Sequence, residues 1–167
     1  MNVSRIDIRD GRAYNTLTSL VKRYDVDPAR LRVEITESAY IRETENLISE
    51  VKRFRKAGFV VEMDDFGAGY SSLNMLNDLD INVLKLDRGL IAQLGKDEKG
   101  DSILRAVVQM AHSLGITTIA EGVETKQQAD YLLSVGCNNM QGFYFSKPTT
   151  AQAFEKLISA RSTDDIK

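Results

Sequence analysis

The sequence predicts an α/β fold in which parallel strands are surrounded by outer helices, as in a (β/α)8 barrel of the TIM type. From residue 31 onward, short β-branched runs alternate with longer stretches of helical periodicity, which is typical of repeated βα units. Each expected strand carries a carboxylate, lysine or amide at or near its C-terminal end. Because these ends converge on one side of a parallel sheet, polar groups from five successive strands favour a closed ring over the single crevice of an open sheet.

Five strands and five helices are expected along the chain. The strands are expected over residues 32–36, 60–64, 83–87, 117–121 and 140–145. The helices are expected over residues 14–24, 45–57, 103–114, the stretch from Thr125 to Gly136, and 150–159. Three of these helices run into a glycine, Gly58, Gly115 or Gly136, which is a common way for a helix to end. Thr125 and Gln128 have the spacing of a capping box.

The composition indicates one soluble domain or part of one. The chain has 167 residues, of which 43% are hydrophobic, and a formal net charge of -2 with both signs interspersed, so no broad attraction for a nucleic acid polymer is expected. No apolar run approaches the length of a membrane span, and no membrane contact is expected from this segment. The single cysteine, Cys137, suits a reducing cytoplasm, and the parent protein could still be tethered to a membrane elsewhere.

Adjacent acids at the end of an expected strand are the first sign of chemistry. Asp64 and Asp65 end the run "VVEMDD", and two carboxylates about 4 Å apart repel by roughly 4 kcal/mol at an effective dielectric constant near 20. Acids facing a common pocket therefore need a cation or a shared proton. Oxygen ligands favour magnesium or manganese, since the one histidine, His112, lies in a helical stripe. Alternatively, one aspartate points into the pocket while the other bonds loop backbone.

The loop after these acids has features of both an anion site and an ordinary strand-to-helix turn. Its notable residues are Phe66, Gly67, Gly69, Ser71 and Ser72. The glycines permit close backbone approach, and either serine could cap the next helix, where a phosphate would be well placed. Lys85 on the next strand could orient a nucleophile or offset developing charge if a metal pair cleaves a phosphodiester, or it could form a buried salt bridge with a neighbouring acid.

Six motifs occur in the order and spacing of a known family. They are "NVS" at 2–4, "VEITES" at 33–38, "DDFGAGYSSL" at 64–73, "LKLD" at 84–87, "AEGVET" at 120–125 and "QGFYFSKP" at 141–148. This series resembles the EAL domain, a family of bacterial phosphodiesterases that open cyclic di-GMP to the linear dinucleotide pGpG, using magnesium or manganese on a (β/α)8-type barrel.

The resemblance implies a role for each matching residue. It implies two metal ions per complete site, with ligands or direct neighbours at Asn2, Glu34, Asp64, Asp65 and Glu121. It implies catalytic roles for Lys85, Glu121 and Glu37, and places Gln141, Glu124 and Asp87 near the substrate. The loop 66–72 would couple metal and substrate binding to dimerisation.

One departure from the family is large. The sequence contains no Glu-Ala-Leu motif, which in the family supplies a metal-binding glutamate, and a complete barrel needs about 250 residues. We therefore expect a partial EAL domain over residues 1–160, lacking its N-terminal strands, with a C-terminal tail over 161–167. Open sheet edges favour a homodimer or other self-association. The alternatives to an active phosphodiesterase are a non-catalytic cyclic di-GMP receptor and an oligomerisation module.

Overall fold

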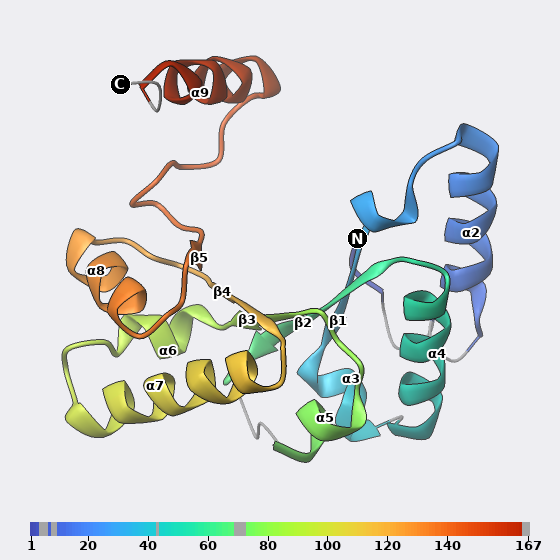
Figure 1. The fold of residues 1–167 in the computed structure, drawn as a ribbon, viewed down its shortest axis with the longest axis horizontal. Helices are drawn as coiled ribbons and strands as arrows, with labels where there is room; N and C mark the ends of the chain where they lie inside the picture. Colours follow the sequence, from blue (N-terminus) through green and yellow to red (C-terminus); the bar gives the residue numbers. More distant parts are fainter. Residues whose placement is uncertain (4–6, 8–9, 43, 69–72, 165–167) are drawn as a thin grey trace.

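The computed structural model describes residues 1–167 except 4–6, 8–9, 43, 69–72 and 165–167. Its centre is one parallel sheet whose five strands follow each other in chain order (Figure 1). The strands are β1 (Arg32–Thr36), β2 (Val60–Phe66), β3 (Val83–Leu86), β4 (Thr117–Ala120) and β5 (Asn139–Met140). An isolated parallel bridge joins Asn2 to Glu34 on the other side of β1. The described strands form an open sheet with β1 and β5 at its ends, so the barrel is not closed.

Helices connect the strands and cover the sheet. They are α2 (Arg12–Tyr24), α3 (Glu37–Arg42), α4 (Thr44–Lys56), α5 (Leu73–Asp78), α6 (Arg88–Ala92), α7 (Glu98–Ser113), α8 (Lys126–Ser134) and α9 (Ala151–Asp164), with a 3-10 turn at Pro28–Arg30. Figure 1 shows α9 well apart from the sheet, at the end of an extended segment. None of the helices in the described part of the chain is long and apolar enough to cross a membrane.

The helix ends follow the chemistry expected from the sequence. Gly58, Gly115 and Gly136 have φ angles of 89°, 72° and 91°, a region in which side chains are strained and glycine is not. At the start of α8, the Gln128 amide donates to Thr125 Oγ1 while the Thr125 amide donates to Gln128 Oε1. The predicted capping box is therefore confirmed.

The core lies between the sheet and its helices. Alternate residues of each strand point to one face, and the helix-facing set is fully buried, including Ile35, Met63, Leu84 and Leu86. Against it pack buried residues of the long helices: Leu47, Val51, Leu104, Val108 and Leu132. Cys137 is buried as a small apolar side chain, and His112 is exposed.

Two strand predictions need correction. The strand expected over 140–145 is wrong, because β5 ends at Met140 and the chain then turns, with the Phe145 amide donating to the Gly142 carbonyl. Apolar runs favour a strand only where they are buried, and Phe143 is 58% exposed. Strand β2 is two residues longer than expected and contains an irregularity. The short helices α3 and α6 were not expected, since each is too short to show a periodic stripe, whereas α5 begins where a helix was expected to follow Ser71 and Ser72.

Candidate active site

Three carboxylates from separate strands meet one lysine at the carboxyl ends of the sheet. Lys85 Nζ lies 2.8 Å from Asp64 Oδ1, 2.8 Å from Glu121 Oε1 and 3.9 Å from Glu34 Oε1. Glu34 belongs to β1, Asp64 to β2 and Lys85 to β3, while Glu121 directly follows β4. We call these four residues the Lys85 cluster. Sequentially adjacent parallel strands bring them together, as their common position at the strand ends predicts.

Strand periodicity explains why Lys85 faces this cluster. Its neighbours Leu84 and Leu86 are fully buried, and because successive side chains in a strand point to opposite faces, Lys85 must point away from the helices. The lysine is itself only 9% exposed. A buried ammonium group requires charged partners, and the three carboxylates supply them.

Asp64 and Asp65 lie in a β-bulge opposite Lys85. Met63 pairs with Leu84 and Phe66 with Leu86, so two residues of β2 oppose the single Lys85 of β3. Asp65 has φ 60°, a left-handed conformation that aspartate tolerates better than most residues. The bulge re-aims the chain locally. Of the two adjacent acids, Asp64 contacts Lys85 at 2.8 Å, whereas Asp65 is exposed.

The electrostatics of the cluster leave a surplus of negative charge. Burial on its own lowers the pKa of Lys85, but the hydrogen bonds and charges of Asp64 and Glu121 outweigh it, and the net pKa is raised. Lys85 therefore stays protonated at neutral pH. Burial, and then the charges of Asp64 and Asp87, raise the pKa of Asp65. Three carboxylates against one ammonium give the cluster a formal charge of -2.

Two further predicted residues are attached directly to the cluster. The Gln141 side-chain amide donates to Glu121 Oε1 at 2.9 Å. Asn2 forms its bridge with Glu34, held by the Glu34 amide donating to the Met1 carbonyl and the Val3 amide donating to the Glu34 carbonyl, both at 2.9 Å. Gln141 thus contacts the cluster through its side chain, whereas Asn2 is paired with Glu34 through the backbone.

Glu37 lies where the loop leaves β2. It is the first residue of α3 and is 6% exposed, and its Oε2 accepts a hydrogen bond from the Gly67 amide at 3.3 Å. Gly67 has φ 95°, and a Cβ at this position would lie 2.3 Å from Leu90 Cδ1. Only glycine therefore fits without rearrangement. Phe66 is buried in the core, whereas Gly69, Ser71 and Ser72 lie outside the described residues.

Asp87 and Glu124 have partners other than Lys85. Asp87 caps α6, because its Oδ1 accepts from the Gly89 amide at 2.7 Å. Glu124 is exposed, and its backbone amide donates to Gln128 Oε1 at 2.8 Å. It also lines a cavity of about 450 Å³ near the start of α8, together with Lys96. The hydrogen bonds of Asp87 and Glu124 thus link them to local residues and not to the Lys85 cluster.

A cavity of about 490 Å³ adjoins the cluster and contains residues that the sequence did not single out. It is lined by Arg88, Glu121, Gln141, Phe143, Lys147 and Phe154, among others. The Lys147 ammonium lies over the Phe143 ring, 5.8 Å from its centroid. Arg88 could have been noticed because it follows the polar end of β3, and Phe143 because it lies in the motif at 141–148, but Phe154 carries no sequence signal that separates it from core residues.

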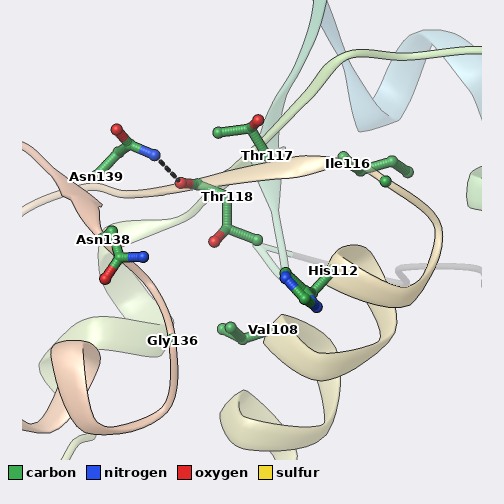
Figure 2. Close-up of a pocket in the computed structure, with 9 residues that line it drawn as sticks. Val108, His112, Ile116, Thr117, Thr118, Gly136, Asn138 and Asn139 are labelled. Atoms are coloured by element: carbon green, nitrogen blue, oxygen red, sulfur yellow. Dashed lines mark hydrogen bonds between the residues drawn. The ribbon is translucent and has the colours of Figure 1, made fainter.

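Another cavity, of about 340 Å³, lies at the opposite end of the sheet (Figure 2). His112, Thr117, Asn138 and Asn139 line it, and the Asn139 side-chain amide donates to the Thr118 carbonyl at 3.3 Å. Thr117 begins β4, whereas Glu121 follows its end. Because no acid lines this cavity among the described residues, the candidate active site is the Lys85 cluster with its adjoining cavity.

The fold and the site together indicate a class of protein. It is the class of barrel-type α/β domains that carry an acid-rich site at the carboxyl ends of their strands. The chain belongs to the EAL domain family, whose model matches residues 1–148. It is 35% identical over 156 residues to the cyclic di-GMP phosphodiesterase PdeR of Escherichia coli, an alignment that covers 93% of this chain and 24% of PdeR. The chain thus spans about a quarter of that relative.

Solved structures agree with this assignment. The phosphodiesterase of MucR, determined as a c-di-GMP complex, has a TM-score of 0.84 and 33% identity, and the match covers 92% of this chain and 62% of that one. BlrP1 of Klebsiella pneumoniae, determined as a manganese and cy-diGMP complex, has a TM-score of 0.82 and 32% identity, covering 89% of this chain and 38% of that one. The family is therefore one whose characterised members include cyclic di-GMP phosphodiesterases.

Proposed function

We propose that this chain takes part in hydrolysis of cyclic di-GMP to linear pGpG with magnesium or manganese. The observation that carries the proposal is the convergence of three carboxylates from separate strands on Lys85. Membership of the EAL family and the activity in the name of PdeR support the substrate. In the reaction, a water oxygen forms a bond to phosphorus, the bond from phosphorus to a ribose oxygen breaks, and that oxygen takes up a proton.

The donor atoms of the site are of the type that divalent metal ions prefer, but within the described residues no three Asp, Glu, His or Cys side chains are placed to hold one ion. Carboxylate and amide oxygens are the ligands that magnesium and manganese prefer, and the surplus negative charge of the cluster is what a divalent cation would neutralise. We infer that the ions, two in a complete site, are held by Glu34, Asp64, Asp65, Glu121 and Asn2. Bound ions would lower the pKa of water and offset charge on the phosphate. The manganese in the BlrP1 complex supports this choice of metal.

Lys85 acts in this proposal as a fixed positive charge. Its ammonium group lies between Asp64 and Glu121, so it is placed as a hydrogen-bond donor. It can hold the attacking water by a hydrogen bond, or stabilise the charge that develops on the phosphate. A neighbouring carboxylate such as Glu121 would take the proton, and Gln141 would fix the orientation of that carboxylate.

The adjoining cavity offers groups that suit the substrate. Arg88 and Lys147 provide positive charge for a phosphate, and Phe143 and Phe154 provide exposed aromatic faces for a guanine base. Its volume of about 490 Å³ lies within the usual range of small-molecule sites. We infer that one half of cyclic di-GMP enters this cavity while its phosphate lies at the Lys85 cluster. Glu37 and Asp87 would act indirectly, through the backbone amides that they hold, and Glu124 through the cavity that it lines beside α8.

A second function is favoured by the placement of the acids. Within the part of the chain that the structure describes, no three of them are set to hold one ion, and a two-metal site that is short of a ligand loses both ion binding and water activation. The chain could then bind cyclic di-GMP without cleaving it. Calorimetric titration with cyclic di-GMP in calcium, followed by a magnesium or manganese assay for pGpG, separates the two: heat with product supports the enzyme, heat without product supports the receptor. Neither signal would favour an oligomerisation module.

We further propose that the chain associates with itself. The described sheet ends at β1 with a single bridge and at β5 with two paired residues, and unpaired strand edges readily add another strand. Analytical ultracentrifugation over a hundredfold dilution should show a species heavier than 18.7 kDa that dissociates on dilution. A monomer at every concentration would contradict this.

A further inference from the structure

Helix α9 lies beyond the part of the chain that the family model matches, yet it supplies one wall of the cavity beside the Lys85 cluster. The family match ends at residue 148, whereas α9 begins at Ala151. Phe154 of this helix lines the cavity of about 490 Å³ together with Phe143. The two side chains are 52% and 58% exposed, so both rings have apolar area that a ligand in the cavity would cover.

The segment that carries α9 is itself part of this cavity. Residues 146–149 line it in an unbroken run, and Thr150 follows them directly. Thr150 caps the helix, because its hydroxyl accepts from the Ala153 amide at 3.3 Å and its carbonyl accepts from the Phe154 amide at 2.9 Å. Phe154 is thus joined through one helical turn to the segment that lines the cavity. A ligand that fills the cavity would contact both.

Packing against the core does not hold α9 in one position. Figure 1 shows the helix well apart from the sheet, at the end of an extended segment. None of its residues from Ala151 to Ser159 is buried, since Leu157 is half-buried and the others are exposed. Few buried contacts therefore oppose movement of α9 about residues 146–149. Covering Phe154 with a ligand would remove apolar area from water, which favours closure.

We propose that α9 is a movable wall of this cavity: it moves about residues 146–149, and Phe154 then covers a guanine base that packs on Phe143. An aromatic ring suits this role, because stacking on a nucleobase is favourable and tolerates any base. Arg88 provides positive charge for the phosphate of the same nucleotide. The inference rests on the proposed function for the identity of the nucleotide, but the movement of α9 is measured without turnover.

The first test uses a fluorescent reporter in the wall itself. The sequence contains no tryptophan, so Phe154→Trp provides a single emitting side chain. The probes are GMP, which carries one guanine and one phosphate, and cyclic di-GMP in calcium. Stacking on the base should quench the emission by about half at saturating nucleotide. The matched control is Ile158→Trp, because Ile158 is 53% exposed one turn further along α9 and does not line the cavity. Its emission should change little.

Affinity and hydrogen exchange provide the second test. Phe154→Ala should raise the dissociation constants of GMP and cyclic di-GMP about tenfold, because one base–aromatic stack is lost. Ile158→Ala should bind as tightly as the wild type, and Phe154→Trp should retain the affinity. Bound nucleotide should slow exchange of the backbone amides of α9 in the wild type and not in Phe154→Ala. In hydrolysis, the effect of Phe154→Ala should appear in KM more than in kcat, as expected for uniform binding.

Failure of this inference and failure of the proposed function give different results. If nucleotide binds and slows exchange in α9 but no pGpG forms, hydrolysis fails and the movable wall stands. If pGpG forms while Phe154→Ala binds as tightly as Ile158→Ala, the role of Phe154 is overturned and hydrolysis stands. Weaker binding by Phe154→Ala without slower exchange in wild-type α9 would overturn the movement. Emission of Phe154→Trp that follows protein concentration instead of nucleotide would assign this face to contact between copies and overturn the inference. Binding of neither nucleotide would overturn both.

Discussion

Replacing Lys85 by methionine isolates the electrostatics of the cluster. Methionine nearly preserves the length of the side chain but removes its charge. The side chains of Lys85, Asp64 and Glu121 are 11%, 16% and 18% exposed, so their ion pairs are largely buried. Removing one partner of a buried ion pair costs roughly 3–5 kcal/mol of unfolding free energy. For a chain of this size, each kcal/mol corresponds to about 2–4 °C. We expect the melting temperature of Lys85→Met to fall by about 6–20 °C in a chelating buffer.

Manganese should reverse much of this loss. A divalent ion bound among the carboxylates supplies the positive charge that the variant lacks, and a ligand that binds only the folded state stabilises it in proportion to its saturation. Thermal unfolding followed by circular dichroism, with manganese varied at pH 7, is the assay. The manganese-induced rise in melting temperature should be clearly larger in Lys85→Met than in the wild type. The matched control is Lys52→Met, since Lys52 is exposed on α4.

An equal response to manganese in Lys85→Met and the wild type would refute the proposed electrostatic role of Lys85. That role would also be refuted if Lys85→Met were as stable as Lys52→Met without metal, because the carboxylates would then not need the ammonium group. Hydrolysis by the variant should fall by about 10²-fold or more if Lys85 stabilises the developing charge.

Three further predictions concern Asp65, Gly67 and Thr125. The pKa of Asp65 is raised in the folded state, so ionisation costs stability as pH rises through that pKa. Asp65→Asn should therefore be more stable than the wild type at pH 7. The gain in unfolding free energy should be less than about 1 kcal/mol, because solvent screens this carboxylate. In denaturant titrations, the unfolding free energies of the two proteins should become equal near pH 3. The variant should nevertheless bind manganese more weakly by calorimetry, and a variant that is less stable at pH 7 would contradict the sign. Gly67→Ala should destabilise by about 1–3 kcal/mol, whereas Gly100→Ala, where a Cβ meets nothing within 4 Å in α7, should be neutral or stabilising in urea titrations. Thr125→Ala should cost about 0.5–2 kcal/mol in the same titration through loss of the helix cap, and no loss would show that the capping box is dispensable.

Much of the site was predictable because it depends on where strands end. Glu34, Asp64, Lys85 and Glu121 each stand in or just after the C-terminal part of a recognisable strand, and parallel pairing brings these parts together. Asp87 and Glu124 occupy similar sequence positions, yet one caps α6 and the other is exposed beside α8. A strand end limits a residue to a region of space. It does not choose between a side chain that enters the site and one that satisfies local backbone.

The sequence by itself determined the parallel order of the strands, the helix stops and the chemical type of the site. These depend on local properties: hydrophobic periodicity, positive φ at glycine and the distribution of carboxylates along the chain. Only the tertiary structure decided that the two aspartates share a bulge opposite Lys85, that the run after Met140 turns, and that the Tyr40 hydroxyl donates to Asp78. Register shifts and contacts between residues 38 positions apart depend on how separate elements pack, and no local pattern specifies that packing.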